Sequence, residues 1–113
     1  MSSFHDPRKL LYDILQAAQQ IEEFSRDLDK KAFLKNNMIL SACERKFEII
    51  GEAMNRLRKR FPEVVSKIPD ADKIIGFRNI IVHGYDIVSP SIIWSSVQKD
   101  IPELIKSIKA LLD

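Results

Sequence analysis

The spacing of apolar residues constrains this chain more than any other feature. Over most of its 113 residues, apolar side chains recur every three or four positions, with only three glycines and five prolines to interrupt them. The longest such run predicts a helix over 37–60, through Ile39, Cys43, Phe47, Ile50, Met54, Leu57 and Phe61. No alternating strand pattern longer than four residues occurs. We therefore expect an all-α fold, an up-and-down bundle of four to five helices.

Polar caps and prolines predict where the first helices begin and end. Asp6 followed by Pro7 is typical of an N-cap and a first helical residue, and the apolar pattern after them predicts a helix over 7–28. Asp29 can cap the next segment. Pro62 stops the long helix, so we expect the segment PEVVSKIP (62–69) to be a connector or a short helical turn.

The region after this connector carries a similar set of signals. Asp70 or Asp72 begins a helix that runs through Ile81. Gly84 stands where a glycine commonly follows the last residue of a helix. This predicts that the helix ends close to residue 83.

The last helix is predicted from Ser89 and Pro90, which repeat the signal of a cap followed by proline. Pro102 falls inside the apolar pattern of that helix. Because proline has no amide hydrogen and its ring clashes with the preceding turn, we expect a kink or a break near Asp100.

Composition limits the kinds of protein that this chain can be. Its length fits a single domain over residues 1–113. One cysteine, Cys43, excludes an internal disulfide and fits a cytoplasmic location. No uncharged stretch of 18 residues and no secretory signal occurs, so we expect no membrane span. No glycine-rich phosphate loop or metal-ligand spacing occurs, so we expect no cofactor and no metal.

The stretch RNIIVHGYD (78–86) places strongly polar side chains around an apolar triplet. It has a purely structural interpretation, because Arg78 and His83 near a helix end meet the partial negative charge of the last carbonyls, and Gly84 ends the helix. It also has a chemical interpretation. A histidine held at a helix end beside an arginine, an asparagine and a tyrosine is well equipped for proton transfer.

The separation of Arg78 and His83 bears on this choice. They are five residues apart, about 140° around an ideal helix, so they are not the usual surface pair of a helix. They can converge only if the helix ends at or before His83, or if a second copy of the motif is brought alongside. His83 is also one of only two histidines, the other being His5 near the N-terminus.

The residues Arg78, Asn79, His83 and Tyr85 resemble the Arg-x-x-x-x-His-x-Tyr motif of the HEPN superfamily, in its HepT-like branch. The flanking segments are similar too: GFRNIIVHGY (76–85) to the signature of the branch, RKFEIIGEA (45–53) to its long preceding helix, and IIWSSVQKDIPELI (92–105) to its final helix. The resemblance covers nearly the whole chain, in the same order.

This resemblance implies a helical homodimer in which the two motifs face a shared cleft. Its relatives are metal-independent endoribonucleases, typically the toxin of a type II toxin–antitoxin pair. The antitoxin is a small MNT-type nucleotidyltransferase, which is reported to silence the toxin by adenylylating the tyrosine of the motif. By position, the modified residue here would be Tyr85.

The chemistry of RNA cleavage suits these residue types independently of the family. Cleavage by the neighbouring 2′-hydroxyl needs a base, an acid and positive charge on the phosphorane. His83 can serve as base or acid near neutral pH, and the planar guanidinium of Arg78 suits a phosphate. Asn79 and Tyr85 can support them, by orienting the substrate or His83 and by donating to a phosphate oxygen.

Two other classes of function remain open on the sequence. The chain could be a non-catalytic helical partner and substrate of a nucleotidyltransferase, in which case Tyr85 would matter and His83 would not. It could also be a plain dimerisation domain, although an end to the helix needs only Gly84 and not the whole polar set.

A basic cluster lies at the C-terminal end of the predicted long helix and is formed by Arg56, Arg58, Lys59 and Arg60. It is a candidate for RNA binding through salt-dependent contacts with phosphates. It could equally complement the helix dipole and stay solvated, or bind an acidic face of the antitoxin.

The same helix contains a glycine, Gly51, where glycine is unfavourable by up to about 1 kcal/mol relative to alanine. A glycine at such a place usually permits the close approach of another backbone or a ligand. It shares a stripe with Glu44, Glu48 and Asn55. Glu48 could orient Arg78 or His83 across the bundle, or the stripe could be a solvated face or a polar dimer interface.

Overall fold

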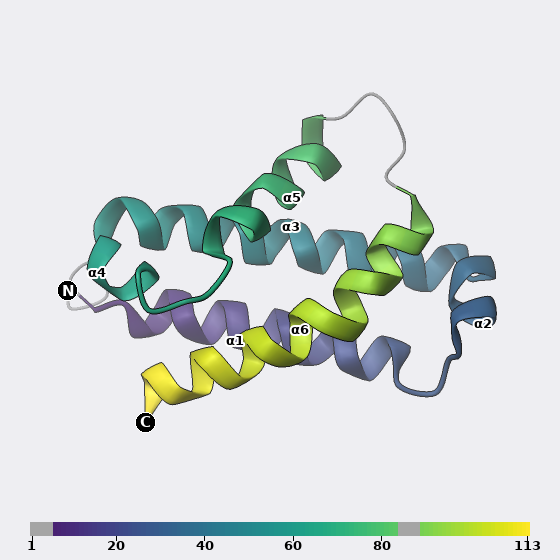
Figure 1. Cartoon of the computed structure of the whole chain (residues 1–113), viewed down its shortest axis with the longest axis horizontal. Helices are drawn as coiled ribbons and strands as arrows, with labels where there is room; N and C mark the ends of the chain where they lie inside the picture. The colour runs from purple at the N-terminus through teal and green to yellow at the C-terminus, as the bar shows by residue number, and fades with distance from the viewer. Residues whose placement is uncertain (1–5, 84–88) are drawn as a thin grey trace.

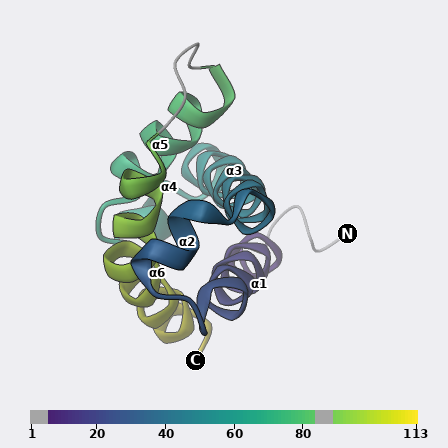
Figure 2. The same cartoon turned by 90° about the vertical axis from the view of Figure 1, so that its right-hand side faces the viewer.

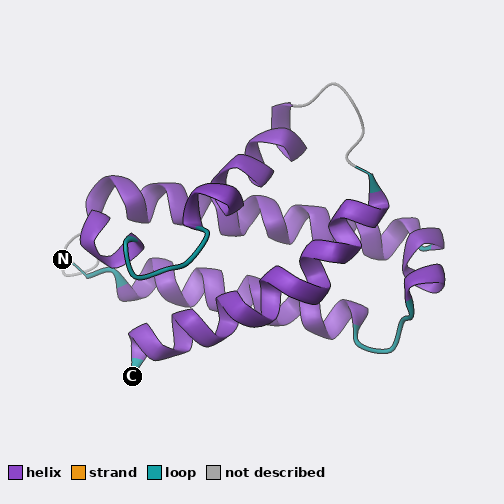
Figure 3. Ribbon diagram, viewed as in Figure 1, coloured by secondary structure: helices purple, strands orange, loops and turns teal. Residues whose placement is uncertain are grey.

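The computed structural model describes residues 6–83 and 89–113, without the side chains of Val82 and His83. Six helices follow one another along these residues: α1 (Arg8–Ser25), α2 (Lys30–Lys35), α3 (Asn37–Arg60), α4 (Pro62–Val65), α5 (Ala71–His83) and α6 (Pro90–Leu112). No strand occurs within these ranges (Figure 3). The all-α prediction is therefore confirmed, and α4 is the short helical turn that the sequence allowed after Pro62.

The helices pack around a central antiparallel pair, α1 and α3, which lie side by side (Figure 1, Figure 2). α6 packs on α1, whereas α5 packs on α3. α2 lies at one end of the bundle, where it contacts both α3 and α6. The C-terminal part of α5 rises away from the rest of the bundle (Figure 1).

The core forms where the apolar stripes of these helices meet. Its large side chains that lie at or below 2% exposure come from α1, α2, α3 and α6: Leu11, Ile14, Ile21, Phe33, Cys43, Ile50, Met54, Leu57, Ile93, Ile101 and Ile108. Burial of this apolar surface is the main favourable term in folding. No helix within the described ranges is long and apolar enough to cross a membrane.

Two of the predicted helix starts are confirmed by hydrogen bonds that amides of the first turn donate to a capping side chain. The Ala32 amide donates to Oδ1 of Asp29 at 2.8 Å. Ser89 caps α6, because its Oγ accepts a hydrogen bond from the Ser91 amide at 3.3 Å. Each of these bonds satisfies an amide that has no partner within the helix.

The first helix ends three residues earlier than the pattern predicts. α1 stops at Ser25 instead of residue 28, and a turn follows in which the Leu28 amide donates to the Ser25 carbonyl at 3.1 Å. The hydroxyl of Ser25 bonds back to the Ile21 carbonyl at 2.8 Å. Leu28 still packs against the core from this turn, so the apolar pattern continues past the end of the helix.

Of the kink or break expected near Asp100, α6 shows a bend but no break. α6 runs without interruption from Pro90 to Leu112 with Pro102 inside it, although Figure 1 shows a bend about halfway along the helix. Pro102 is exposed, while its neighbours Ile101 and Leu104 are buried. Apolar contacts on both sides of the proline therefore hold the helix together across the missing hydrogen bond.

Candidate active site

The polar motif lies in the last part of α5, the helix that packs on α3. Arg78 and Asn79 belong to its described turns, and His83 is the last residue of α5 that the structure describes. The helix end predicted from Gly84 lies outside the described residues. The side chain of His83 and the whole of Tyr85 lie outside the described residues. The geometry of the site is therefore built from Arg78 and its surroundings.

α5 crosses α3 at Arg78, whose side chain packs directly on Gly51. A methyl group on the α-carbon of Gly51 would lie 2.1 Å from Cβ of Arg78 and 2.6 Å from its Cγ. Such distances are far shorter than any ordinary contact between carbon atoms. Gly51 is buried beneath α5, so this part of the polar stripe is a packed contact and not a solvated face.

The guanidinium of Arg78 is left with spare hydrogen-bonding capacity. Its Nη1 donates to Oδ1 of Asn79 at 3.3 Å, while its buried Nε has no hydrogen-bond partner. A buried donor without an acceptor is unfavourable by roughly 1–3 kcal/mol. Within the described ranges, no carboxylate forms an ion pair with Arg78. Among the residues that the structure describes, no anion therefore neutralises the charge of Arg78.

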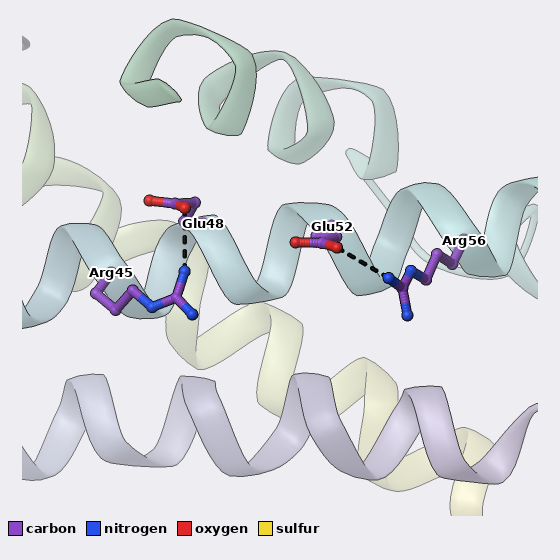
Figure 4. A network of polar contacts seen from close by, with 4 residues as sticks. All are labelled: Arg45, Glu48, Glu52 and Arg56. Carbon is purple, nitrogen blue, oxygen red and sulfur yellow. Dashed lines mark hydrogen bonds and ion pairs between the residues drawn. The ribbon is translucent and has the colours of Figure 1, made fainter. Parts of the chain in front are cut away.

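The acidic residues on α3 near this site form ion pairs along their own helix. Glu48 accepts a hydrogen bond from Nη1 of Arg45 at 3.0 Å, and Glu52 accepts one from Nη2 of Arg56 at 3.0 Å (Figure 4). Glu48 therefore contacts Arg45 and not Arg78. An orienting role for Glu48 gains no support from these contacts.

The basic cluster at the end of α3 is partly neutralised. Arg56 pairs with Glu52, and Arg58 pairs with Asp72 at 3.0 Å, which ties α3 to the start of α5. Lys59 and Arg60 are exposed. Since the pairs lie at the surface, they contribute little stability, about 0–1 kcal/mol each, and an incoming phosphate can compete for the arginines.

An apolar groove of about 360 Å³ lies between α5 and α6, with α3 at its base. Its lining includes Ile50, Phe77, Ile80, Ile92 and Leu104. Ile80 and Ile92 are 56% and 54% exposed. Large apolar side chains that stand open to water beside a groove are typical of an interaction surface.

Polar contacts join the two helices where Lys73 and Asp100 line the groove. Nζ of Lys73 on α5 lies 3.2 Å from Oδ1 of Asp100 on α6. The other carboxylate oxygen of Asp100 accepts a hydrogen bond from Ser96 at 2.9 Å. α5 and α6 are thus joined near the start of α5 and separate toward the motif.

Cys43 is a core residue, as predicted from its place on the apolar stripe. It is fully buried, and burial, with a smaller contribution from the charge of Glu44, raises the pKa of its thiol from 9.0 to about 11. A thiol in such surroundings is a poor nucleophile. In the part of the chain that is described, no cluster of three or more potential metal ligands occurs.

Comparison with known proteins was consistent with these features. A family model described as "Ribonuclease HepT-like" matches residues 14–111. The chain is 37% identical to "Putative RNase MJ1380" of Methanocaldococcus jannaschii, over 95% of this chain and 97% of the relative. It is 39% identical to "Putative RNase TTE0752" of Caldanaerobacter subterraneus, over 94% of both. It is 34% identical to "Probable ribonuclease HepT" of Thermococcus cleftensis, over 83% and 84%. No solved structure gave a significant match.

Proposed function

The chain belongs to the HepT-like ribonuclease family of the HEPN superfamily, and we propose that it is a metal-independent endoribonuclease that acts as the toxin of a toxin–antitoxin pair. The observation that supports this best is the unsatisfied hydrogen bonding and charge of the Arg78 guanidinium. Its charge has no carboxylate partner among the described residues, and its buried Nε has no acceptor. A phosphate group of RNA would supply the missing negative charge and the missing acceptors.

In the proposed reaction the 2′-hydroxyl oxygen attacks the adjacent phosphorus, and the bond from phosphorus to the 5′-oxygen breaks. The products are a 2′,3′-cyclic phosphate and a 5′-hydroxyl. His83 takes the proton from the 2′-hydroxyl or gives one to the leaving 5′-oxygen, and Arg78 stabilises the charge of the phosphorane. Asn79 holds the guanidinium of Arg78 from its side, and Tyr85 donates to a phosphate oxygen.

This reaction needs both a base and an acid, yet each chain supplies one histidine in its motif. A homodimer would provide two copies of His83 and of Arg78 around one substrate. The apolar groove between α5 and α6 supports such a dimer, because Ile80 and Ile92 leave an exposed apolar surface three residues before His83 and three residues after Ser89. A second copy seated there would bring the two motifs together in a shared cleft.

We further propose that an MNT-type nucleotidyltransferase antitoxin controls the enzyme through Tyr85. The phenol oxygen of Tyr85 would attack the α-phosphorus of ATP, and pyrophosphate would leave while the phenol proton passes to a base of the antitoxin. The adenylyl group would then add bulk and negative charge two residues from His83. This would block the approach of an RNA phosphate by steric hindrance and charge repulsion.

The test is to incubate unmodified protein with total RNA in excess EDTA, beside His83→Ala, Arg78→Ala and the exposed control Lys109→Gln. Intact mass is measured first, because an adenylyl group on Tyr85 would mask activity. We expect cleavage by wild type and Lys109→Gln, and a loss of about 10²–10⁴ in rate for the two motif variants.

Two outcomes would contradict the proposal. Cleavage by His83→Ala at the wild-type rate would remove His83 from the chemistry. If unmodified wild type does not cleave RNA at all, the alternative that the chain is a non-catalytic substrate of a nucleotidyltransferase gains weight. That alternative is then tested by adding a nucleotidyltransferase antitoxin and ATP and comparing the mass of wild type with that of Tyr85→Phe.

A further inference from the structure

Gly51 meets Arg78 at a contact that a side chain on α3 would prevent. The stem of Arg78 occupies the space in which the Cβ of any other residue at position 51 would lie, at 2.1 Å from Cβ and 2.6 Å from Cγ. Cγ could move by rotation about the Cα–Cβ bond, but the position of Cβ is fixed by the backbone. Cβ therefore cannot move aside unless α5 itself shifts or turns.

The second glycine near the site behaves differently. Gly76 lies on α5, two residues before Arg78, and a methyl group there would meet nothing within 4 Å. The requirement for glycine is therefore confined to the contact with Arg78, and is not a general need for small residues between these helices. Gly76 provides a matched control for the chemical change from glycine to alanine.

The contact also explains the state of the guanidinium. With its stem pressed on the bare backbone of α3, Arg78 has its Nε buried without an acceptor, and Nη1 turned to Asn79. The nearby carboxylates of Glu48 and Glu52 pair with Arg45 and Arg56 along α3. The aliphatic part of Arg78 is thus fixed by packing, while no anion among the described residues holds its charged end.

We propose that Gly51 is a positioning residue for Arg78, a role that rests on the proposed ribonuclease function for its catalytic consequence. It does not touch the substrate. Because Gly51 has no side chain, Cβ and Cγ of Arg78 can pack on the backbone of α3. This packing fixes the position from which the guanidinium contacts the phosphate. Since a misplacement of about 1 Å at a catalytic group can lower a rate about 10²-fold, a methyl group at position 51 should affect catalysis strongly.

The first experiment is a double-mutant cycle with Gly51→Ala and Arg78→Gly, measured on a labelled oligoribonucleotide that wild type cleaves. We expect Gly51→Ala to lower kcat about 10²-fold with little change in KM. In the Arg78→Gly background the same substitution should lower kcat no further, because both the guanidinium and the Cβ that the new methyl group would meet are already absent. A loss that is as large in that background as in wild type would overturn the proposal.

The second experiment does not depend on activity. The buried Nε–H of Arg78 is followed by NMR as its hydrogen exchanges with water, and its signal is identified by its absence in Arg78→Lys. Exchange should become at least about tenfold faster in Gly51→Ala, since a stem lifted from α3 exposes Nε. The exchange rate should stay unchanged in Gly76→Ala. Because Gly76 lines the groove of the proposed dimer interface, sedimentation must first show that this variant has the same oligomeric state as wild type. Equal exchange in wild type and Gly51→Ala would overturn the proposal even if the protein cleaves RNA.

A third comparison covers the case in which Gly51→Ala unfolds. Arg78→Gly removes both Cβ and Cγ, so adding Gly51→Ala to it should not lower the melting temperature further. If Gly51→Ala lowers the melting temperature of Arg78→Gly as much as it lowers that of wild type, the contact with Arg78 is not the cause of the destabilisation. Should wild type fail to cleave RNA, the proposed function fails, while the exchange and melting comparisons still decide whether Gly51 holds Arg78.

Discussion

The rings of Phe47 on α3 and Phe77 on α5 meet edge to face, with centroids 5.0 Å apart and planes at 81°. Phe47 lies four residues before Gly51, and Phe77 directly precedes Arg78. The aromatic pair and the contact between Gly51 and Arg78 are therefore neighbours along the same line where α5 crosses α3. Together they hold the start of the motif, while α5 beyond them rises from the bundle (Figure 1).

Replacing either ring should loosen α5. Phe47→Ala should lower the free energy of unfolding by about 3 kcal/mol, because Phe47 is buried, and Phe77→Ala by less, because Phe77 is half-buried. Urea unfolding of the two single variants and the double variant should give a coupling of about 1 kcal/mol between the rings. Phe24→Ala on α1 serves as a control that should not couple with Phe77→Ala.

The proposed dimer depends on the exposed apolar groove. A buried carboxylate without a partner is strongly unfavourable, so Ile80→Glu and Ile92→Glu should each convert a dimer to a folded monomer. Met38→Glu is the matched control, since Met38 is 81% exposed on α3 but does not line the groove. Sedimentation equilibrium gives the mass, and circular dichroism reports the fold. Dimers of unchanged stability in both groove variants would place the interface elsewhere.

RNA binding by the basic cluster should depend on salt in a residue-specific way. We expect Lys59→Gln, made in the His83→Ala background to prevent cleavage, to reduce the slope of log affinity against log salt by about 1. Arg56→Gln should have a smaller effect, because Arg56 already pairs with Glu52. Fluorescence anisotropy with one oligoribonucleotide at several salt concentrations measures both. Slopes identical to that of the parent would exclude the cluster from RNA binding.

The buried thiol makes a prediction about stability at high pH. The pKa of Cys43 is raised to about 11 in the folded chain, while the unfolded chain keeps the ordinary value. Between these two pKa values the unfolded state loses the thiol proton and the folded state retains it. The thiol's contribution to stability is therefore complete below pH 9 and is lost as the pH rises toward 11.

Cys43→Ala provides the comparison, because other groups titrate in the same range. The difference in free energy of unfolding between wild type and Cys43→Ala, measured by urea titration, should shrink from pH 8.5 to pH 11. A constant difference across this range would show that Cys43 keeps an ordinary pKa in the folded chain.

Much of the fold could be predicted because the signals were local. The caps at Asp29 and Ser89 act within one turn, and the limits of α3 follow from the apolar stripe and Pro62. The predicted end of α1 at residue 28 was wrong, because Leu28 packs against the core from a turn outside the helix. The helix around Pro102 bends but does not break, since buried neighbours on both sides of the proline keep α6 continuous.

The site could be predicted only in part for the same reason. The residue types at positions 78 and 83 indicate the chemistry, and Gly51 indicates a close approach to α3. No local pattern says that the approaching group is Arg78, because the two positions are distant in sequence and meet only when α5 packs on α3. The pair of Glu48 with Arg45 is different, because the two residues are three apart on one helix and their spacing indicates it.

The burial of Cys43 has a practical consequence for following α5 in solution. Cys43 is the chain's only cysteine, and its thiol is sealed in the core with a raised pKa. A new cysteine at an exposed position outside the groove, such as Asp72 on α5 or Met38 on α3, would therefore react with a thiol-directed spin label or dye while the native sulfur stays unlabelled. Distances between such probes would report the movement of the motif helix without any change to the natural core.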